Sequence, residues 1–228
     1  MKRSLAAAAR FTIGAKALMA VTGVVLLLFV LGHMVGNLQV FAGQEQLNAY
    51  AAFLKGLGPG LWLMRLVLLA CLLLHVWAAV LVVRRNRAAR PVAYAVKVDQ
   101  VTSYAARTMI WSGVLVLAFV IYHLLHFTIG AYDPAGSFGR LDAAGRPDVY
   151  GRVIAGFRHV PTTVTYVIAQ VLLCMHIHHG ASSLVQSLGL RTRLTARCAD
   201  RIGPALAIVI LTGNLSMPLA IVTGLIGS

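Results

Sequence analysis

The sequence is poor in charged residues, and above all in acidic ones. Only 11% of its 228 residues are charged, against about a quarter in an ordinary soluble domain, and six are Asp or Glu. So few charges cannot cover the surface of a soluble enzyme of this length. The hydrophobic content of 59% also excludes a disordered chain, because disorder requires few apolar residues. Together these properties predict an integral membrane protein.

Cysteine is also scarce. The three cysteines are far apart and form no CxxC pair, which argues against a disulfide framework or a thiolate metal site. Twenty Lys and Arg residues give a formal net charge of +14. A nucleic-acid-binding face is the usual explanation of such a charge, but here long apolar runs separate the basic residues. We therefore expect no nucleic-acid partner.

Five apolar runs are long enough to cross a membrane, which takes about 20 residues of helix. The first is longer than the apolar region of a signal peptide, so we interpret it as a retained membrane helix. Gly, Pro and Asp place 132–158 outside the membrane, with room for a short surface helix. The whole chain, 1–228, is predicted to be one all-α transmembrane domain. Its spans lie at about 17–40, 61–83, 108–129, 162–184 and 204–226.

Basic residues are distributed unequally between the two sides of these spans. The segments before the first span, between the second and third, and between the fourth and fifth hold 14 of the 20 basic residues. They hold only two of the six acids. These three segments lie on one side of the membrane, so the positive-inside rule places the N-terminus in the cytoplasm and the C-terminus outside. The same basic residues are expected to bind anionic lipid.

Histidines occur in four of the five apolar runs, where ionisable residues are costly and usually functional. The acids that a proton relay or a cation transporter would use are almost absent from these runs. Neutral imidazoles without charged partners suit a metal, and paired histidines between apolar helices most often hold heme iron. The candidates are His33, His75, His123, His126, His176, His178 and His179.

Depth along the helices divides the candidates into two pairs. At about 1.5 Å per residue, His33 and His123 lie roughly 9 Å from the outer ends of their runs. His75 and His176 lie about 20–22 Å below the outer ends, in the inner half of the membrane. We therefore predict an outer heme between His33 and His123 and an inner heme between His75 and His176, with the four histidines as iron ligands.

Two of these choices stay open, because histidines three positions apart lie on neighbouring faces of a helix. His126 is the alternate to His123, and His179 is the alternate to His176. Small residues near the ligands would let a broad porphyrin approach the helix backbones, although ordinary close packing of helices uses the same residues. These small residues are Gly32, Gly36, Ala78, Ala79 and Gly180.

At these histidines the sequence resembles the cytochrome b membrane-anchor subunit of succinate dehydrogenase and fumarate reductase, in its single-chain, five-helix, di-heme form. The resemblance covers nearly the whole chain and includes H-x-x-x-G in the fourth run. The stretches that carry it are LGHMVGNLQVF, LNAYAAFLKGLG, LLLHVWAAVLVVRRNRAARPVAYAVK, SYAARTMIWSGVLVLAFVIYHLLHF and MHIHHGASSLVQSLG. The axial ligands of the family map onto His33, His75, His123 and His176.

The resemblance implies cofactors, partners and a location. Two heme b groups would lie in the anchor, and a flavoprotein and an iron–sulfur protein would bind its cytoplasmic side, with some basic residues docking the iron–sulfur subunit. The flavoprotein would interconvert succinate and fumarate, so the anchor would be the electron-transfer and quinone-reactive subunit rather than the dicarboxylate catalyst. Di-heme anchors are usually paired with menaquinone. The implied place is the bacterial cytoplasmic membrane, in the respiratory chain and the tricarboxylic acid cycle.

Three further residues are candidates for contacts with these cofactors. Arg107 and Ser187 could hold the propionates of the inner heme, although Arg107 could equally reach lipid phosphate. Glu45 is a candidate proton acceptor at a quinone site, against the simpler interpretation of a solvated loop acid. Two other functions stay open: a di-heme quinol-oxidising subunit of another respiratory complex, such as a nitrate reductase, and a membrane transporter that uses the same histidines without heme.

Overall fold

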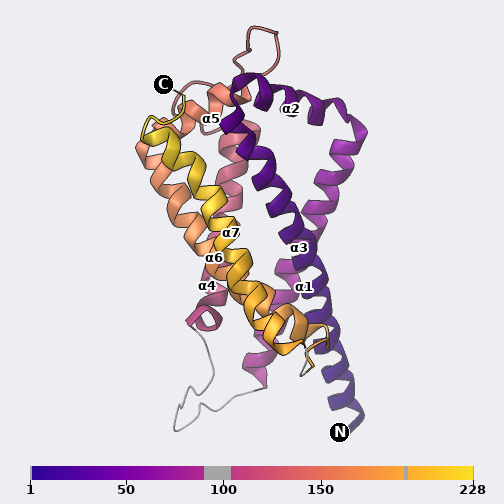
Figure 1. The fold of residues 1–228 in the computed structure, drawn as a ribbon. Coiled ribbons are helices and arrows are strands. Elements are labelled where there is room, and N and C mark those ends of the chain that lie inside the picture. Colours follow the sequence, from indigo (N-terminus) through magenta and orange to yellow (C-terminus); the bar gives the residue numbers. More distant parts are fainter. Residues whose placement is uncertain (1, 90–103, 193–194, 228) are drawn as a thin grey trace.

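The computed structural model describes residues 2–89, 104–192 and 195–227, which are mostly helical and contain no β-strand (Figure 1). Two shorter helices lie at one end of the bundle, which we call the cap: α2 (Gln44–Gly56) and α5 (Val149–Arg158). The N-terminus and the start of α7 lie at the opposite end. Five long helices connect the two ends: α1 (Lys2–Asn37), α3 (Pro59–Ala88), α4 (Tyr104–His123), α6 (Val160–Ser187) and α7 (Ala196–Val222).

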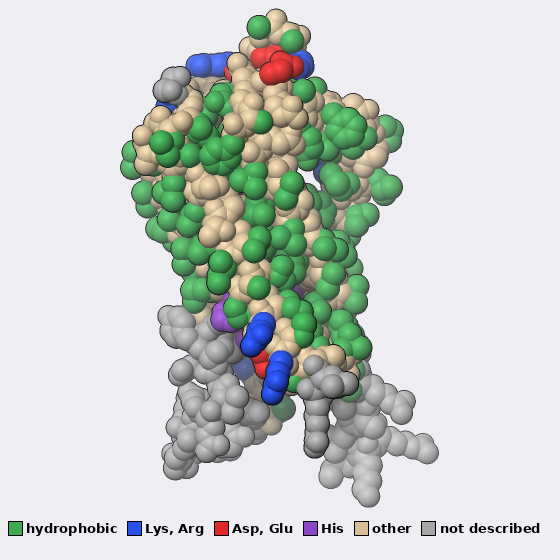
Figure 2. Space-filling model, viewed as in Figure 1, with side chains coloured by type: hydrophobic (Ala, Val, Ile, Leu, Met, Phe, Trp, Pro, Cys, Tyr) green, Lys and Arg blue, Asp and Glu red, His purple; other side chains and the backbone are tan. Residues whose placement is uncertain are grey.

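Among the described residues, five segments are long and apolar enough to cross a membrane, which confirms the predicted all-helical, multi-pass architecture. On the face shown in Figure 2, hydrophobic side chains cover the middle and charged ones gather towards the ends. The orientation of the bundle in the membrane stays a prediction. The segments are Thr12–Ala42, Pro59–Ala88, Thr108–Ile129, Val160–Ser187 and Ala196–Val222.

The helix of the fifth span is shifted towards the N-terminus relative to the predicted range of about 204–226. It starts at Ala196 instead of 204 and ends at Val222 instead of 226. The predicted start coincides with Pro204, the first residue of the longest apolar part of this run. In the structure Pro204 and Pro218 both lie inside α7. Membrane helices tolerate such prolines where neighbouring groups satisfy the freed backbone carbonyls.

The connection between the first two spans is itself helical, which the sequence analysis did not predict. Gly43, with φ of 96°, separates the short 3-10 turn η1 (Leu38–Ala42) from α2. Gly58, with φ of 52°, separates α2 from α3. Positive φ favours glycine, because a Cβ is strained there. α2 therefore forms a separate cap helix rather than an extension of its neighbours. The surface helix allowed for in 132–158 is α5.

The long helices pack as two groups. α1 packs along α3, while α6 packs against both α4 and α7. α1 contacts α6 and α7 at fewer positions and thereby connects the groups. Neither α1 with α4 nor α3 with α6 is a closely packed pair within the described ranges. Side chains, rather than close backbone packing, therefore cross the space between these helices.

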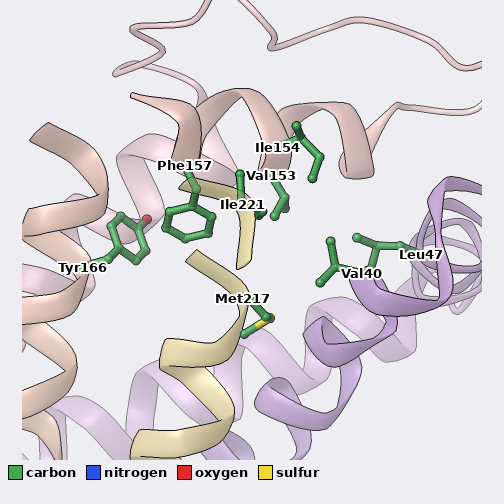
Figure 3. Close-up of a cluster of buried hydrophobic side chains, with 8 residues drawn as sticks. All are labelled: Val40, Leu47, Val153, Ile154, Phe157, Tyr166, Met217 and Ile221. Atoms are coloured by element: carbon green, nitrogen blue, oxygen red, sulfur yellow. The ribbon is translucent and has the colours of Figure 1, made fainter. Parts of the chain in front are cut away.

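Asn48 of α2 joins the elements of the cap. Its buried Nδ2 donates to Asp142 Oδ2 at 3.1 Å and to Asp148 Oδ1 at 3.0 Å, and its Oδ1 accepts the backbone N–H of Tyr150 at 2.9 Å. Asp148 also caps α5 by accepting the N–H of Gly151. Below this network lies a buried apolar cluster that unites η1, α2, α5, α6 and α7 (Figure 3): Val40, Leu47, Val153, Ile154, Phe157, Tyr166, Met217 and Ile221.

Farther from the cap, α6 and α7 pack closely. A second buried cluster lies between them, and the side-chain amides of Gln170 and Asn214 form a hydrogen bond of 2.9 Å. Such interhelical hydrogen bonds and small interface residues are typical of membrane helix pairs. At Gly203 a Cβ would overlap Oγ of Ser182 and the backbone carbonyl of His178, so only glycine allows this approach. This close packing against α7 fixes the position of α6, which lies across the bundle from α1 and α3.

Candidate metal centre

The structure brings together the four histidines that the depth argument selects. The rings of His33 on α1 and His123 at the end of α4 have centroids 5.6 Å apart. The rings of His75 on α3 and His176 on α6 have centroids 6.5 Å apart. Each pair thus joins a helix of the α1–α3 group to a helix of the α4–α6–α7 group.

The two pairs lie at different levels of the bundle. His33 is four residues, about 6 Å, from the cap end of α1 at Asn37. His75 is sixteen residues, about 24 Å, from the cap end of α3 at Pro59. A membrane-spanning bundle with this arrangement has one pair near its cap and one in its opposite half.

The spacing within each pair suits a metal between the rings. Two imidazoles on opposite sides of one metal ion have ring centroids roughly 6 Å apart, because a metal–nitrogen bond is about 2 Å long. The His75–His176 spacing of 6.5 Å agrees with this value, and the His33–His123 spacing of 5.6 Å is slightly shorter. As residues, His33 is exposed and the other three are half-buried.

The donor set is small. In the described part of the chain, no group of three or more His, Cys, Asp or Glu residues could hold a metal ion. Two neutral nitrogens suffice when another group supplies the remaining ligands, as a porphyrin does for iron. The residues present therefore fit a heme better than a bare ion.

In both His75 and His176, polar groups lie within hydrogen-bond distance of the ring nitrogen Nδ1. Nδ1 of His75 lies 3.0 Å from the carbonyl oxygen of Met19 and 3.3 Å from Oγ1 of Thr22. Nδ1 of His176 lies 3.3 Å from Oγ of Ser112. Because a carbonyl only accepts, His75 donates from Nδ1 to Met19 and its Nε2 keeps a free lone pair. This is the tautomer that binds a metal through Nε2.

The sequence analysis missed the glycines that lie against these rings. A Cβ at Gly23 would be 3.2 Å from Cε1 of His75, and a Cβ at Gly113 would be 3.3 Å from Cε1 of His176. Both glycines belong to the helix that packs beside the histidine, whereas the sequence argument searched the histidine's own helix. One pattern in the sequence could have identified these glycines: in both cases a residue with a hydroxyl group directly precedes the glycine within an apolar run.

The small residues that the sequence did select have other surroundings. Gly36 lies against the side chain of Tyr50, and Ala78 is fully buried in α3. These two serve helix packing, the alternative left open above. Gly32 and Gly180 have no neighbour within 4 Å of a Cβ position, so the helix backbone is open there.

His126 is placed differently from His123. A π-helical turn, η2 (Leu124–Ile129), begins directly after His123. The ring of His126 is 2% exposed, its Nε2 lies 3.1 Å from a Cβ position at Gly156, and its Nδ1 lies 3.1 Å from the phenol oxygen of Tyr166. Protein atoms therefore enclose both ring nitrogens of His126.

The other candidates from the sequence lie outside the two pairs. His178 is exposed on α6, and His179 is half-buried on the same helix, three positions after His176. Ser187 is the last residue of α6. Arg107 lies in the first turn of α4, and its side chain is outside the described part of the structure. The contacts predicted for Arg107 and Ser187 stay predictions.

Glu45 lies on the outside of the cap in an ion pair with Arg146. Its carboxylate accepts hydrogen bonds of 2.8 and 2.6 Å from the guanidinium, and its side chain is 80% exposed. The hydrogen bonds from Arg146 hold the pKa of Glu45 below its usual value. A paired carboxylate with a lowered pKa is a weak proton acceptor, which favours the simpler interpretation of a solvated acid.

The arrangement as a whole offers two pairs of neutral nitrogen donors at two levels of an apolar bundle. Imidazole pairs of this kind suit redox-active transition metals such as iron. No protein-family model, curated protein or solved structure matches this chain.

Proposed function

We propose that this chain is the di-heme cytochrome b membrane anchor of a succinate:quinone oxidoreductase. In this role it passes electrons between an iron–sulfur partner and a quinone, with menaquinone as the proposed quinone. The observation that carries the proposal is the placement of two imidazole pairs, at two levels, across the space between the α1–α3 group and the α4–α6–α7 group.

Each side chain has a defined part in this proposal. His33, His75, His123 and His176 are the axial ligands and bind through Nε2. When bound, each heme would supply a one-electron carrier. Three of the four rings have a polar partner at Nδ1, including His123, whose Nδ1 lies 3.2 Å from the phenol oxygen of Tyr166. These partners orient the rings before a metal binds.

The choice of a succinate:quinone oxidoreductase, rather than another respiratory complex, rests on the sequence resemblance. Under this proposal a flavoprotein and an iron–sulfur subunit bind at the end opposite the cap. The positive-inside rule puts that end in the cytoplasm of a bacterial cell, with the chain in the cytoplasmic membrane. The basic residues described at that end include Lys16, Arg84, Arg87, Arg197 and Arg201.

Purification from native membranes tests this function. The tagged chain, extracted in a mild detergent, should bring a flavoprotein and an iron–sulfur protein with it, and succinate should reduce its heme. Heme that a quinol reduces and succinate does not, with a different partner enzyme, would support the alternative respiratory subunit. A purified chain without any heme would contradict both functions and favour a transporter.

A further inference from the structure

The dipeptide Thr22–Gly23 of α1 forms a seat for the imidazole of His75 on α3. Oγ1 of Thr22 is 3.3 Å from Nδ1 of His75, and Thr22 is 4% exposed. The same hydroxyl donates to the carbonyl of Leu18 at 2.8 Å, so its lone pair is free to accept the N–H of His75. Because Gly23 has no side chain, the ring can approach the α1 backbone.

The dipeptide Ser112–Gly113 of α4 forms the same kind of seat for His176 on α6. Oγ of Ser112 is 3.3 Å from Nδ1 of His176 and donates to the carbonyl of Met109 at 3.1 Å. Ser112 is 2% exposed. A Cβ at Gly113 would be 3.3 Å from Cε1 of the ring. Two seats on different helices thus face the two rings of one pair.

We infer that Thr22 and Ser112 are positioning residues: Ser112 fixes the tautomer and the rotation of the His176 ring, and Thr22, together with the Met19 carbonyl, fixes those of the His75 ring. Gly23 and Gly113 provide the space. The Nδ1–H group donates a hydrogen bond to the hydroxyl oxygen, so Nε2 is unprotonated and directed away from the seat. An acceptor at Nδ1 makes the metal-bound nitrogen more basic and so stabilises the oxidised metal. This inference rests on the proposed function, because it describes how the ligands are held.

A hydroxyl bonded to its own helix backbone is common in membrane helices, and this chain has others. Thr212 donates to the carbonyl of Ile208, and Gly213 follows it as Gly23 follows Thr22. However, Thr212 is exposed, and Gly213 faces Met34 rather than an imidazole. Thr212 therefore provides a matched control, with the same dipeptide in another span.

The two seats differ in the number of hydrogen-bond acceptors near Nδ1 of the histidine. His75 has a second acceptor at Nδ1, the carbonyl of Met19 at 3.0 Å. Within the described residues, the hydroxyl of Ser112 is the one hydrogen-bond partner of Nδ1 of His176. Loss of Ser112 should therefore affect the pair more than loss of Thr22.

Redox titration of the purified protein, followed by optical and low-spin EPR spectra, tests the inference. Ser112→Ala should keep both hemes and shift the one-electron equilibrium of the inner heme about tenfold towards reduction, about 59 mV. Thr22→Val should shift the same heme in the same direction by less. Ser112→Thr and Thr22→Ser keep the hydroxyl and should restore the wild-type potential. Thr212→Val should change neither potential.

The possible failures are distinguishable. Wild-type protein without heme would overturn the proposed function. Wild-type protein with two hemes, whose potentials and EPR signals stay the same in Ser112→Ala and Thr22→Val, would overturn the inference alone. If Ser112→Ala does not fold, Gly113→Ala replaces it, because the added methyl group, 3.3 Å from Cε1 of His176, should shift the ring slightly. An unchanged EPR signal of the inner heme in Gly113→Ala would then overturn the inference.

Discussion

The phenol oxygen of Tyr166 lies 3.2 Å from Nδ1 of His123. The same oxygen lies 3.1 Å from Nδ1 of His126. A phenol has one proton, so Tyr166 can accept from one of these histidines while it donates to the other. Acceptance from His123 leaves Nε2 of this ring free beside His33, and the phenol proton then satisfies the enclosed His126. Tyr166 thus offers a physical basis for separating the roles of two histidines, of which the depth argument selects His123 and keeps His126 as the alternate.

Replacement of His123 should remove one heme, whereas replacement of His126 should remove none. His126→Ala should instead lower the free energy of unfolding by about 1–3 kcal/mol, because it leaves the buried Tyr166 hydroxyl without this partner. Heme per chain and unfolding in detergent measure the two effects separately. Heme loss in His126→Ala, together with full heme content in His123→Ala, would show that His126 is the ligand.

His75→Ala and His176→Ala should each remove the same heme, because the two rings form one pair. Each variant should contain one heme per chain, with the potential of the remaining heme close to its wild-type value. His178→Ala, on the same helix as His176 but exposed, is the control and should retain both hemes. The pairing would be wrong if His75→Ala and His176→Ala left different hemes behind.

Asn48→Ala should destabilise the cap by about 2–4 kcal/mol, because it removes three hydrogen bonds and leaves buried polar groups unpaired. Gln46→Ala, an exposed change on the same helix, should alter the free energy of unfolding by less than about 0.5 kcal/mol. Chemical unfolding in detergent compares the two variants. Equal stability of both would contradict the role of Asn48.

The cap should lose stability in acid. Hydrogen bonds from Arg146 lower the pKa of Glu45. Partial burial alone would raise the pKa of Asp142 and Asp148, but their hydrogen bonds outweigh it and lower both. A lowered carboxyl pKa contributes stability above the ordinary values of 3.8 and 4.5, and this contribution is lost as pH falls through the folded-state pKa.

These carboxyl groups should therefore leave the melting temperature in detergent unchanged above about pH 5. At pH values below about 4 they should cause it to decrease. Arg146→Gln should melt at a lower temperature at neutral pH and show a shallower fall in acid, since two of the carboxylates lose their charged partner. An acid-induced fall as steep as in the wild type would mean that this network does not cause it.

The five helical spans, and the approach of His33 to His123 and of His75 to His176, could be predicted because they depend on quantities that a sequence contains directly. The length of an apolar run sets a membrane helix, and the rise per residue sets the depth of a side chain. The start of the fifth helix could not be placed in this way, since Pro204 signals a first turn locally but lies inside α7. α2 was missed because its 13 residues are too short and too polar to stand out as a span.

The surroundings of the histidines were harder to predict, since they depend on which helices pack together. Thr22–Gly23 and Thr212–Gly213 are the same dipeptide in similar apolar runs, yet only the first faces an imidazole. In the sequence, nothing distinguishes Tyr166 from an ordinary aromatic residue of the core. Its role depends on hydrogen bonds from α6 to His123 and His126, which require the packing of α6 against α4 and which no residue pattern predicted.

The most direct test of the central claim is a reduced-minus-oxidised optical spectrum of the purified chain, combined with heme quantification. The account predicts b-type bands, two hemes per chain and two separable steps in a redox titration. A spectrum without b-type bands, from folded chain purified out of heme-replete cells, would contradict it.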